Sequence, residues 1–512
     1  MKKTKYSTPT QFDQNNGVHD IQSVLIGEIF SYLSWQDLKN VVCAMKDDTE
    51  WLNGSIDDHL LLFKSSRFLL SDSYYSLVRR FVEKEINVEI ISSGFDNCIM
   101  QMQSGKRYGY GNNRCSQLGL GEPDDLKITT WREIPRVADE KIKEIVLGIH
   151  HSMMLTESGK VYVCGRNVCG QLGLGEDADF EISSWIESDI PAGERVEQIV
   201  LGSFYSMILT ESGKVYSCGD NECGQLGLGN DADAYTATWS EIALPEREKV
   251  VIIASGGDHS IVLTKYGNMY GCGWNEYGQL GLGNTTENMI TTWTLIPFQE
   301  EERVNNIVLG GHHSMVLTES GKIYGAGSNE DGQLSMEESD TVLVRSWTAI
   351  STPEGEKIKK IILKYLSSIM LTQSGKVFGC GANESDQMCI HRLEERMDES
   401  VRSWSEIILP NNEYVNQIVI DSTNSMVLTT SGIVYRCGKH EDANRSPAES
   451  THEVLGPWRE MPRPAAIENI LRRLPEKITG GMSLFSERLT GAAVEYTDPS
   501  HGADRTVLAC KL

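Results

Sequence analysis

Cysteine and histidine are the side chains of this sequence that could bind a metal, form disulfides or act as nucleophiles. Of the twelve cysteines, eight recur at two fixed positions. Cys164 and Cys169 are five residues apart, as are Cys218 and Cys223, whereas zinc-binding pairs follow C-x-x-C spacing. The repeated cysteines are Cys164, Cys218, Cys272, Cys380 and Cys437, each before a glycine, and Cys115, Cys169 and Cys223. This repetition predicts small, buried structural cysteines in a reducing compartment, and no metal site.

Histidine also recurs at one position, as His151, His259 and His313. We interpret these residues as structural rather than catalytic. The sequence has no P-loop, no G-x-S-x-G elbow and no cluster of metal ligands. It therefore predicts a protein that is not an enzyme and that needs no cofactor.

A long internal repeat accounts for these fixed positions. The turn glycines are Gly105, Gly159, Gly213, Gly267, Gly321, Gly375 and Gly432, so the first five steps are 54 residues each and the last is 57. Seven of the ten tryptophans also repeat at steps of 54, except for 57 between Trp347 and Trp404: Trp131, Trp185, Trp239, Trp293, Trp347, Trp404 and Trp458. Self-similarity at such a period indicates a repeat architecture of seven units.

Each unit has the pattern of four short strands. In the second unit, residues 142–147 and 151–156 are apolar runs, residues 157–160 form a tight turn, and residues 161–164 form a third strand. A structured Gly-Gln-Leu-Gly-Leu-Gly loop follows, and a fourth strand begins at Trp185. Seven four-stranded units predict a mainly β fold, a seven-bladed β-propeller. To close the ring, the strand near residues 86–91 and the strand at Trp458 must belong to neighbouring blades.

The repeats resemble the regulator-of-chromosome-condensation repeat family. Two stretches carry the resemblance, Gly-x-His-His-Ser-Met-x-Leu-Thr-Glu-Ser-Gly-Lys-Val-Tyr at 148–162 and Asn-x-Cys-Gly-Gln-Leu-Gly-Leu-Gly at 167–175. The resemblance covers about residues 86–463 and implies the seven-bladed propeller. The sixth unit departs from it, with Asn383-Glu384-Ser385-Asp386-Gln387-Met388 in place of the glycine loop and a three-residue insertion within 382–403.

A short helical module before the repeats resembles an F-box. Leu25, Ile29 and Leu33 have helical spacing, and Ser34-Trp35-Gln36-Asp37 starts a second helix. Ile26 stands where the family has proline. The resemblance implies that this module binds the linker subunit of a cullin-RING ubiquitin ligase through Leu25, Glu28, Ile29, Phe30, Leu33, Leu38 and Val42.

The combination implies a substrate-recognition subunit of such a ligase, in which the propeller binds the target protein. It resembles the eukaryotic-like F-box effectors that bacterial pathogens deliver into host cells. Two alternatives remain. The propeller face could act as an exchange factor or regulator of a small GTPase, or the chain could be a non-catalytic scaffold.

Charge and hydropathy argue against some classes of partner. The formal net charge is −25, which disfavours binding to nucleic acid and to anionic membrane surfaces. No run of about 18 apolar residues is present, so no transmembrane helix is expected. We expect a cytoplasmic protein, in the host cytosol if it is a secreted effector. The expected domains are a tail (1–20), the F-box-like module (21–55), a helical linker (56–85), the propeller (86–463) and a C-terminal extension (464–512).

Positions that vary between units indicate where a partner binds. Two such residues lie between a glycine and the histidine position of each unit, so they should ring one face of the propeller. Aromatic residues there are poor choices for solvated loops and good interface anchors. The predicted substrate face consists of Phe95, His150, Phe204, Asp258, His312 and Tyr365, with Trp274 from another variable position.

Overall fold

The computed structural model describes most of the repeat region. The described residues are 86–438, apart from 122–125, 138–139, 246–247, 286, 299–301, 337–341, 391–399 and 421–422, and 458–468 apart from 466. The tail, the F-box-like module and the helical linker predicted for residues 1–85 lie outside them, as do residues 469–512 of the C-terminal extension. Within the described ranges, no helix is long and apolar enough to cross a membrane.

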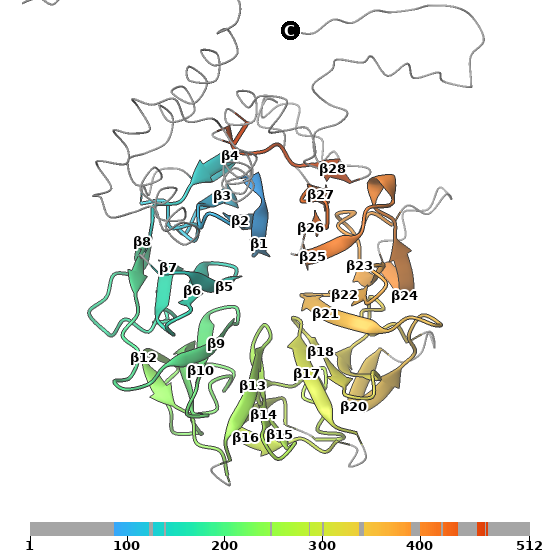
Figure 1. The fold of residues 1–512 in the computed structure, drawn as a ribbon. Coiled ribbons are helices and arrows are strands. Elements are labelled where there is room, and N and C mark those ends of the chain that lie inside the picture. The colour runs from blue at the N-terminus through green and yellow to red at the C-terminus, as the bar shows by residue number, and fades with distance from the viewer. Residues whose placement is uncertain are drawn as a thin grey trace, which may run out of the picture. The chain divides into compact units, whose positions relative to one another are not determined.

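Seven antiparallel sheets of four consecutive strands form a ring, which confirms the seven-bladed propeller (Figure 1). The first strand of each blade lies innermost and the fourth outermost (Figure 1). The strands are, blade by blade, β1 Val88–Ser93, β2 Asn97–Met102, β3 Arg107–Asn112 and β4 Lys127–Glu133; β5 Ile142–Leu147, β6 His151–Thr156, β7 Val161–Arg166 and β8 Glu181–Glu187; β9 Val196–Leu201, β10 Tyr205–Thr210, β11 Val215–Asp220 and β12 Tyr235–Glu241; β13 Val250–Ser255, β14 His259–Thr264, β15 Met269–Trp274 and β16 Met289–Leu295; β17 Val304–Leu309, β18 His313–Thr318, β19 Ile323–Ser328 and β20 Leu343–Ile350; β21 Ile358–Lys364, β22 Ser367–Thr372, β23 Val377–Ala382 and β24 Ser400–Ile407; β25 Val415–Ile420, β26 Asn424–Thr429, β27 Val434–Gly438 and β28 Arg459–Glu460. A short 3-10 helix, η1 Pro410–Asn412, precedes β25.

Burial explains the pattern of each strand. The second strand of every blade is buried along its whole length, as β6 is, because neighbouring blades cover both of its faces. The outer strand β8 is mostly exposed, and Trp185 is its one buried residue. Between β6 and β7, the turn glycine Gly159 has φ +86°, a conformation that glycine adopts without steric cost.

The glycine loop joins each of the first four blades to the next. Gly173 has φ +64°, and a Cβ atom there would lie 2.3 Å from the indole Nε1 of Trp239 in the following blade. The backbone N–H of Gly175 donates a hydrogen bond of 2.9 Å to the carbonyl of Ala237 on outer strand β12. The repeated glycines and tryptophans are therefore two halves of one contact between blades.

A buried polar chain reinforces this contact. His151 Nε2 lies 3.0 Å from Ser206 Oγ of the next blade, and that hydroxyl donates a 2.6 Å hydrogen bond to the carbonyl of Gln171. The same chain recurs at His259–Ser314–Gln279 and at His313–Ser368–Gln333. All three histidines are fully buried. This confirms that they are structural.

The ring closes between the seventh and first blades by side-chain contacts. Gln417 Nε2 donates a 2.7 Å hydrogen bond to the carbonyl of Glu89, and the N–H of Ile91 donates to Gln417 Oε1 at 3.2 Å. Gln198 makes the same pair of bonds to Ile253 within the ring. β28 pairs with β27, so the strand after Trp458 completes the last blade as predicted.

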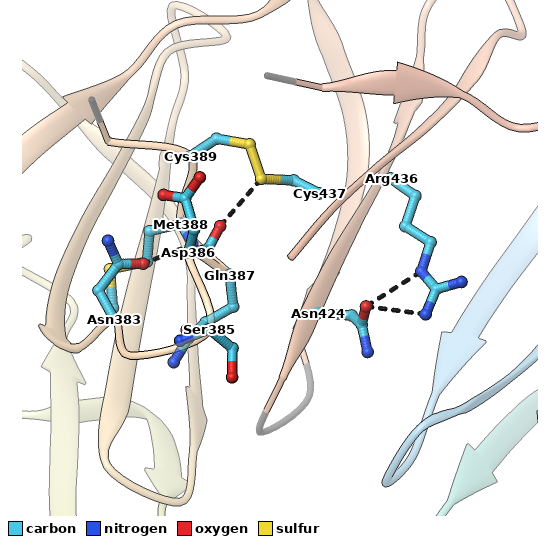
Figure 2. Close-up of a disulfide and its surroundings, with 9 residues drawn as sticks. All are labelled: Asn383, Ser385, Asp386, Gln387, Met388, Cys389, Asn424, Arg436 and Cys437. Atoms are coloured by element: carbon cyan, nitrogen blue, oxygen red, sulfur yellow. Dashed lines mark hydrogen bonds between the residues drawn. A yellow bond between two sulfur atoms is a disulfide. The ribbon is translucent and has the colours of Figure 1, made fainter. Parts of the chain in front are cut away.

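The cysteine prediction is correct for the inner position in four blades and wrong in the seventh. Cys164, Cys218, Cys272 and Cys380 are free and buried. Cys437, interpreted from the sequence as another apolar filler, instead forms a disulfide with Cys389 (Figure 2). Cys115, Cys169 and Cys223 are free but only half-buried.

The buried histidines predict acid sensitivity. Burial lowers the pKa of His151, His259 and His313 to about 3, whereas the unfolded chain binds protons at these residues below a pKa of about 6.5. The free energy of unfolding should therefore be highest above about pH 6.5 and fall as pH drops toward 3, by about 2 kcal/mol per histidine at pH 5. Urea unfolding at pH 7.5 and pH 5 measures this difference.

A double variant tests the assignment. His259→Asn with His313→Asn introduces the residue found at the equivalent positions Asn97 and Asn424. It should remove about 4 kcal/mol of the loss between the two pH values. An unchanged pH dependence in this variant would contradict the role assigned to the histidines.

Candidate partner-binding face

The predicted substrate residues lie at one end of the strands. Six of them, Phe95, His150, Phe204, Asp258, His312 and Tyr365, fall in the short loop between the first and second strands of their blades. Trp274 ends β15, and its backbone N–H donates a 2.8 Å hydrogen bond to the carbonyl of Asp258. The two sets of variable positions therefore share one end of the propeller. We call these seven residues, with the glycine loops beside them, the loop face.

Loops from different blades meet at the centre of the ring. The rings of Phe95 and Tyr365 are 6.3 Å apart in an edge arrangement, although the first and sixth blades are not neighbours. Backbone hydrogen bonds link loops of successive blades, from Ser203 N–H to Gly257 O at 3.0 Å and from Gly311 N–H to Tyr365 O at 2.9 Å. The loop face is therefore a connected surface rather than seven separate loops.

Other aromatic side chains of the loop face pair with neighbouring loops. The rings of His150 and Phe204 are 5.2 Å apart, and those of His312 and Tyr277 are 4.7 Å apart. Tyr277 was not predicted, although it occupies the position of Cys115, Cys169 and Cys223 in its unit. Every residue of the predicted set is half-buried, so each combines support from its neighbours with an exposed surface.

Negative charge gathers on the third and fourth blades, beside His312 of the fifth. Burial raises the pKa of Asp258, and the neighbouring carboxylate of Asp220 raises it further. Burial lowers the pKa of His312, although Asp258 and Glu276 oppose that shift. Asp220 ends β11 at the position that Trp274 has in the next blade, so the same inter-unit comparison could have identified it. This sector therefore presents carboxylates that repel one another.

The second blade instead places a cation, the guanidinium of Arg166, near the loop face. Burial and the Arg166 guanidinium lower the pKa of His150.

The free thiols near the loop face are poor nucleophiles. Cys115 Sγ lies 3.7 Å from His150 Nδ1, but burial raises the pKa of the thiol. Burial and Asp258 raise the pKa of Cys223 to about 11. These thiols stay protonated near neutral pH, so the loop face is suited to binding rather than to nucleophilic chemistry.

Comparison with known families agrees with this fold. The RCC1-like domain family matches residues 187–480, and the regulator of chromosome condensation (RCC1) repeat matches residues 142–171. The first match covers more than half of the 512 residues. The chain belongs to the RCC1-like domain family. Neither match includes residues 21–55, where the F-box-like module was predicted.

Individual relatives differ in what their names describe. The chain is 30% identical over 321 residues to the ultraviolet-B receptor UVR8 of Arabidopsis thaliana, covering 60% of this chain and 68% of the relative. It is 31% identical over 286 residues to the secretion-regulating guanine nucleotide exchange factor of Bos taurus, covering 55% and 60%. The crystal structure of Prp20p from Saccharomyces cerevisiae has a TM-score of 0.58 at 23% identity, covering 69% of this chain and 83% of that one. This last likeness shows the fold.

Two aromatic residues of the loop face provide a test of partner binding. Phe204→Ala combined with Tyr365→Gly should weaken partner capture by about tenfold or more, because aromatic anchors dominate interface energies. Glycine is chosen because Tyr365 has φ +47° and its equivalents are Gly257 and Gly311. The melting temperature should change little. Partner binding is measured by titration, and melting by scanning calorimetry.

Tyr266→Ala is the matched control, since Tyr266 is 78% exposed at the opposite end of the strands. It should leave binding unchanged. If the double variant melts much lower and yet binds its partner normally, the aromatics support neighbouring loops and the loop face is not the binding surface.

Proposed function

We propose that this chain is a protein-binding propeller that acts on a small GTPase, as an exchange factor or another regulator, through its loop face. The observation that carries the proposal is the acidic and aromatic sector around Asp258. The repeat scaffold does not require a pair of carboxylates there. The residues equivalent to Asp220 and Asp258 are Asn112 with His150, Arg166 with Phe204, Trp274 with His312, and Ser328 with Leu366. Cationic groups of a partner would relieve the repulsion between Asp220 and Asp258.

A GTPase offers a target of this chemistry. Its nucleotide is held by a lysine and a magnesium ion that neutralise the phosphates. A carboxylate brought to that site competes with the phosphates for both cations and weakens nucleotide binding. The bovine relative named a guanine nucleotide exchange factor supports this choice.

The test is nucleotide release. Small GTPases loaded with a fluorescent GDP are mixed with the full-length protein, and release is followed after excess GTP is added. We expect one of them to release GDP at least tenfold faster, and Asp258→Asn to remove about tenfold of the acceleration, or about 1.4 kcal/mol. Glu319→Gln makes the same charge change at the opposite end of the strands, where Glu319 is exposed, and should have no effect. A set of GTPases that neither binds nor releases nucleotide faster would contradict the proposal.

The sequence favours a second candidate, a substrate receptor of a cullin-RING ubiquitin ligase. It depends on the F-box-like residues of 21–55, which the described part of the chain does not include. In this case the loop face would hold the substrate, and the N-terminal module would hold the linker subunit. With either function we propose a cytoplasmic location, the one expected from the sequence.

Substitution in the F-box-like stripe separates the two candidates. Leu25→Ala with Phe30→Ala removes two apolar side chains that would pack on the linker subunit, so co-precipitation of linker and cullin should fall to background. Circular dichroism should show a folded propeller, and any GTPase binding should persist. Linker capture that survives the double substitution would rule out the F-box interpretation.

A further inference from the structure

A disulfide joins the sixth blade to the seventh. Cys389 ends the loop that begins at Asn383 after β23, and Cys437 lies in β27 (Figure 2). Their Cα atoms are 6.2 Å apart, within the range that a disulfide spans without moving the backbone. Both residues are buried in one apolar cluster with Trp458.

The position of Cys437 already directs a thiol toward the preceding blade. Cys164, Cys218 and Cys380 occupy the same position, and each donates a hydrogen bond of 3.5 Å to the carbonyl of a glutamine in the preceding loop. Cys437 Sγ lies 3.0 Å from the carbonyl of Asp386, in the equivalent loop (Figure 2). A reduced Cys437 therefore has a loop carbonyl within hydrogen-bonding distance, one residue before the glutamine position that its equivalents use, so the reduced state also fits the scaffold.

The position of Cys389 is where the sequence departs from the scaffold. Four of its equivalents, Gly119, Gly173, Gly227 and Gly281, have φ between +61° and +66°, and a Cβ atom in any of them would lie within 2.4 Å of the next tryptophan. The fifth-blade equivalent is Ser335, with φ +52°. Cys389 keeps this left-handed conformation, with φ +49°, which disfavours a residue with a side chain. The scaffold therefore accepts glycine or serine at this position, and the bond to Cys437 gives a cysteine there a role that neither of them has.

The seventh blade is the blade that a covalent link would stabilise most. β28 is two residues long, whereas the other outer strands have seven or eight. The seventh blade therefore has the shortest outer strand pairing in the described ring. The disulfide ties this blade to the sixth through a loop that belongs to the loop face.

We propose that Cys389 and Cys437 form a reversible redox site, which exchanges with low-molecular-weight disulfides such as oxidised glutathione and locks the seventh blade when oxidised. The Cys389 thiolate attacks one sulfur of oxidised glutathione and releases one glutathione thiolate. The Cys437 thiolate then attacks the mixed disulfide at Cys389 and releases the second. In total the protein gives up two electrons and two protons, and one oxidised glutathione becomes two reduced molecules.

Burial limits how a reductant reaches the disulfide. Cys389 is 7% exposed and Cys437 is 2% exposed, so a reductant reaches the bond when the seventh blade moves away from the sixth. Cys389 is the more exposed of the two residues, so we assign it the first attack on the incoming disulfide.

The experiment uses the full-length protein equilibrated in glutathione buffers of different ratio. Free thiols are alkylated and the protein is digested for mass spectrometry. We expect a linked Cys389–Cys437 peptide in oxidising buffer, both cysteines alkylated in reducing buffer, and a midpoint between the two. Reduction should lower the melting temperature by about 5 °C, because the bond closes a loop of 48 residues.

Two variants make the result specific. Cys437→Ala should melt at the lower temperature in both buffers, whereas Cys380→Ala, the same change in the neighbouring blade, should keep the response to reductant. The proposal fails if Cys389 and Cys437 alkylate fully in oxidising buffer, or if the link never opens in reducing buffer. It also fails if the reduced protein binds zinc stoichiometrically at the two thiols and Asp386, whose ligand atoms lie within 4.8 Å of one another, since they would then form a metal site.

Discussion

The contact between a left-handed glycine and the tryptophan of the next blade is the constraint on which the ring depends. The glycine at each of the positions 119, 173, 227 and 281 leaves less than a methyl group's space beneath the indole. The loop can therefore approach the neighbouring sheet and hydrogen-bond to its outer strand. A 54-residue unit cannot bury both faces of its sheet alone, so this contact fixes the angle at which successive sheets stack.

That constraint also separates the scaffold from the surface available for function. The tryptophan that contacts the preceding blade recurs in every unit, its glycine partner in four, and the buried histidine–serine pair in three. The variable residues of the loop face are free of these contacts, and they carry the aromatic pairs and the coupled carboxylates. One fold can therefore serve relatives whose names describe a light receptor and an exchange factor.

Periodicity made most of the fold predictable, and distance across the ring made the rest unpredictable. The spacing of glycine and tryptophan locates each strand within its own unit and identifies equivalent loop positions. It does not indicate that Phe95 and Tyr365 meet across the centre, because repeats report register along the chain and not which loops converge. Tyr277 and Asp220 were identifiable only as departures from the repeat. Cys389 was missed because it replaces a glycine rather than joining the repeated cysteines. The F-box-like residues rest on sequence alone.

The interface between the first and seventh blades, which closes the ring, forms last when the chain folds. Bonds from Gln417 to the first blade join residues 326 and 328 apart, whereas the equivalent bonds of Gln198 join residues 55 apart. Each internal interface can form as soon as two adjacent units exist, but the interface that closes the ring cannot form until the seventh unit has been made. During synthesis the inner strand of the first blade leaves the ribosome several hundred residues before its partner. A nascent chain therefore spends most of its synthesis as an open arc whose first and newest sheets each have one uncovered face, and these two faces are the ones open to a chaperone or a premature partner.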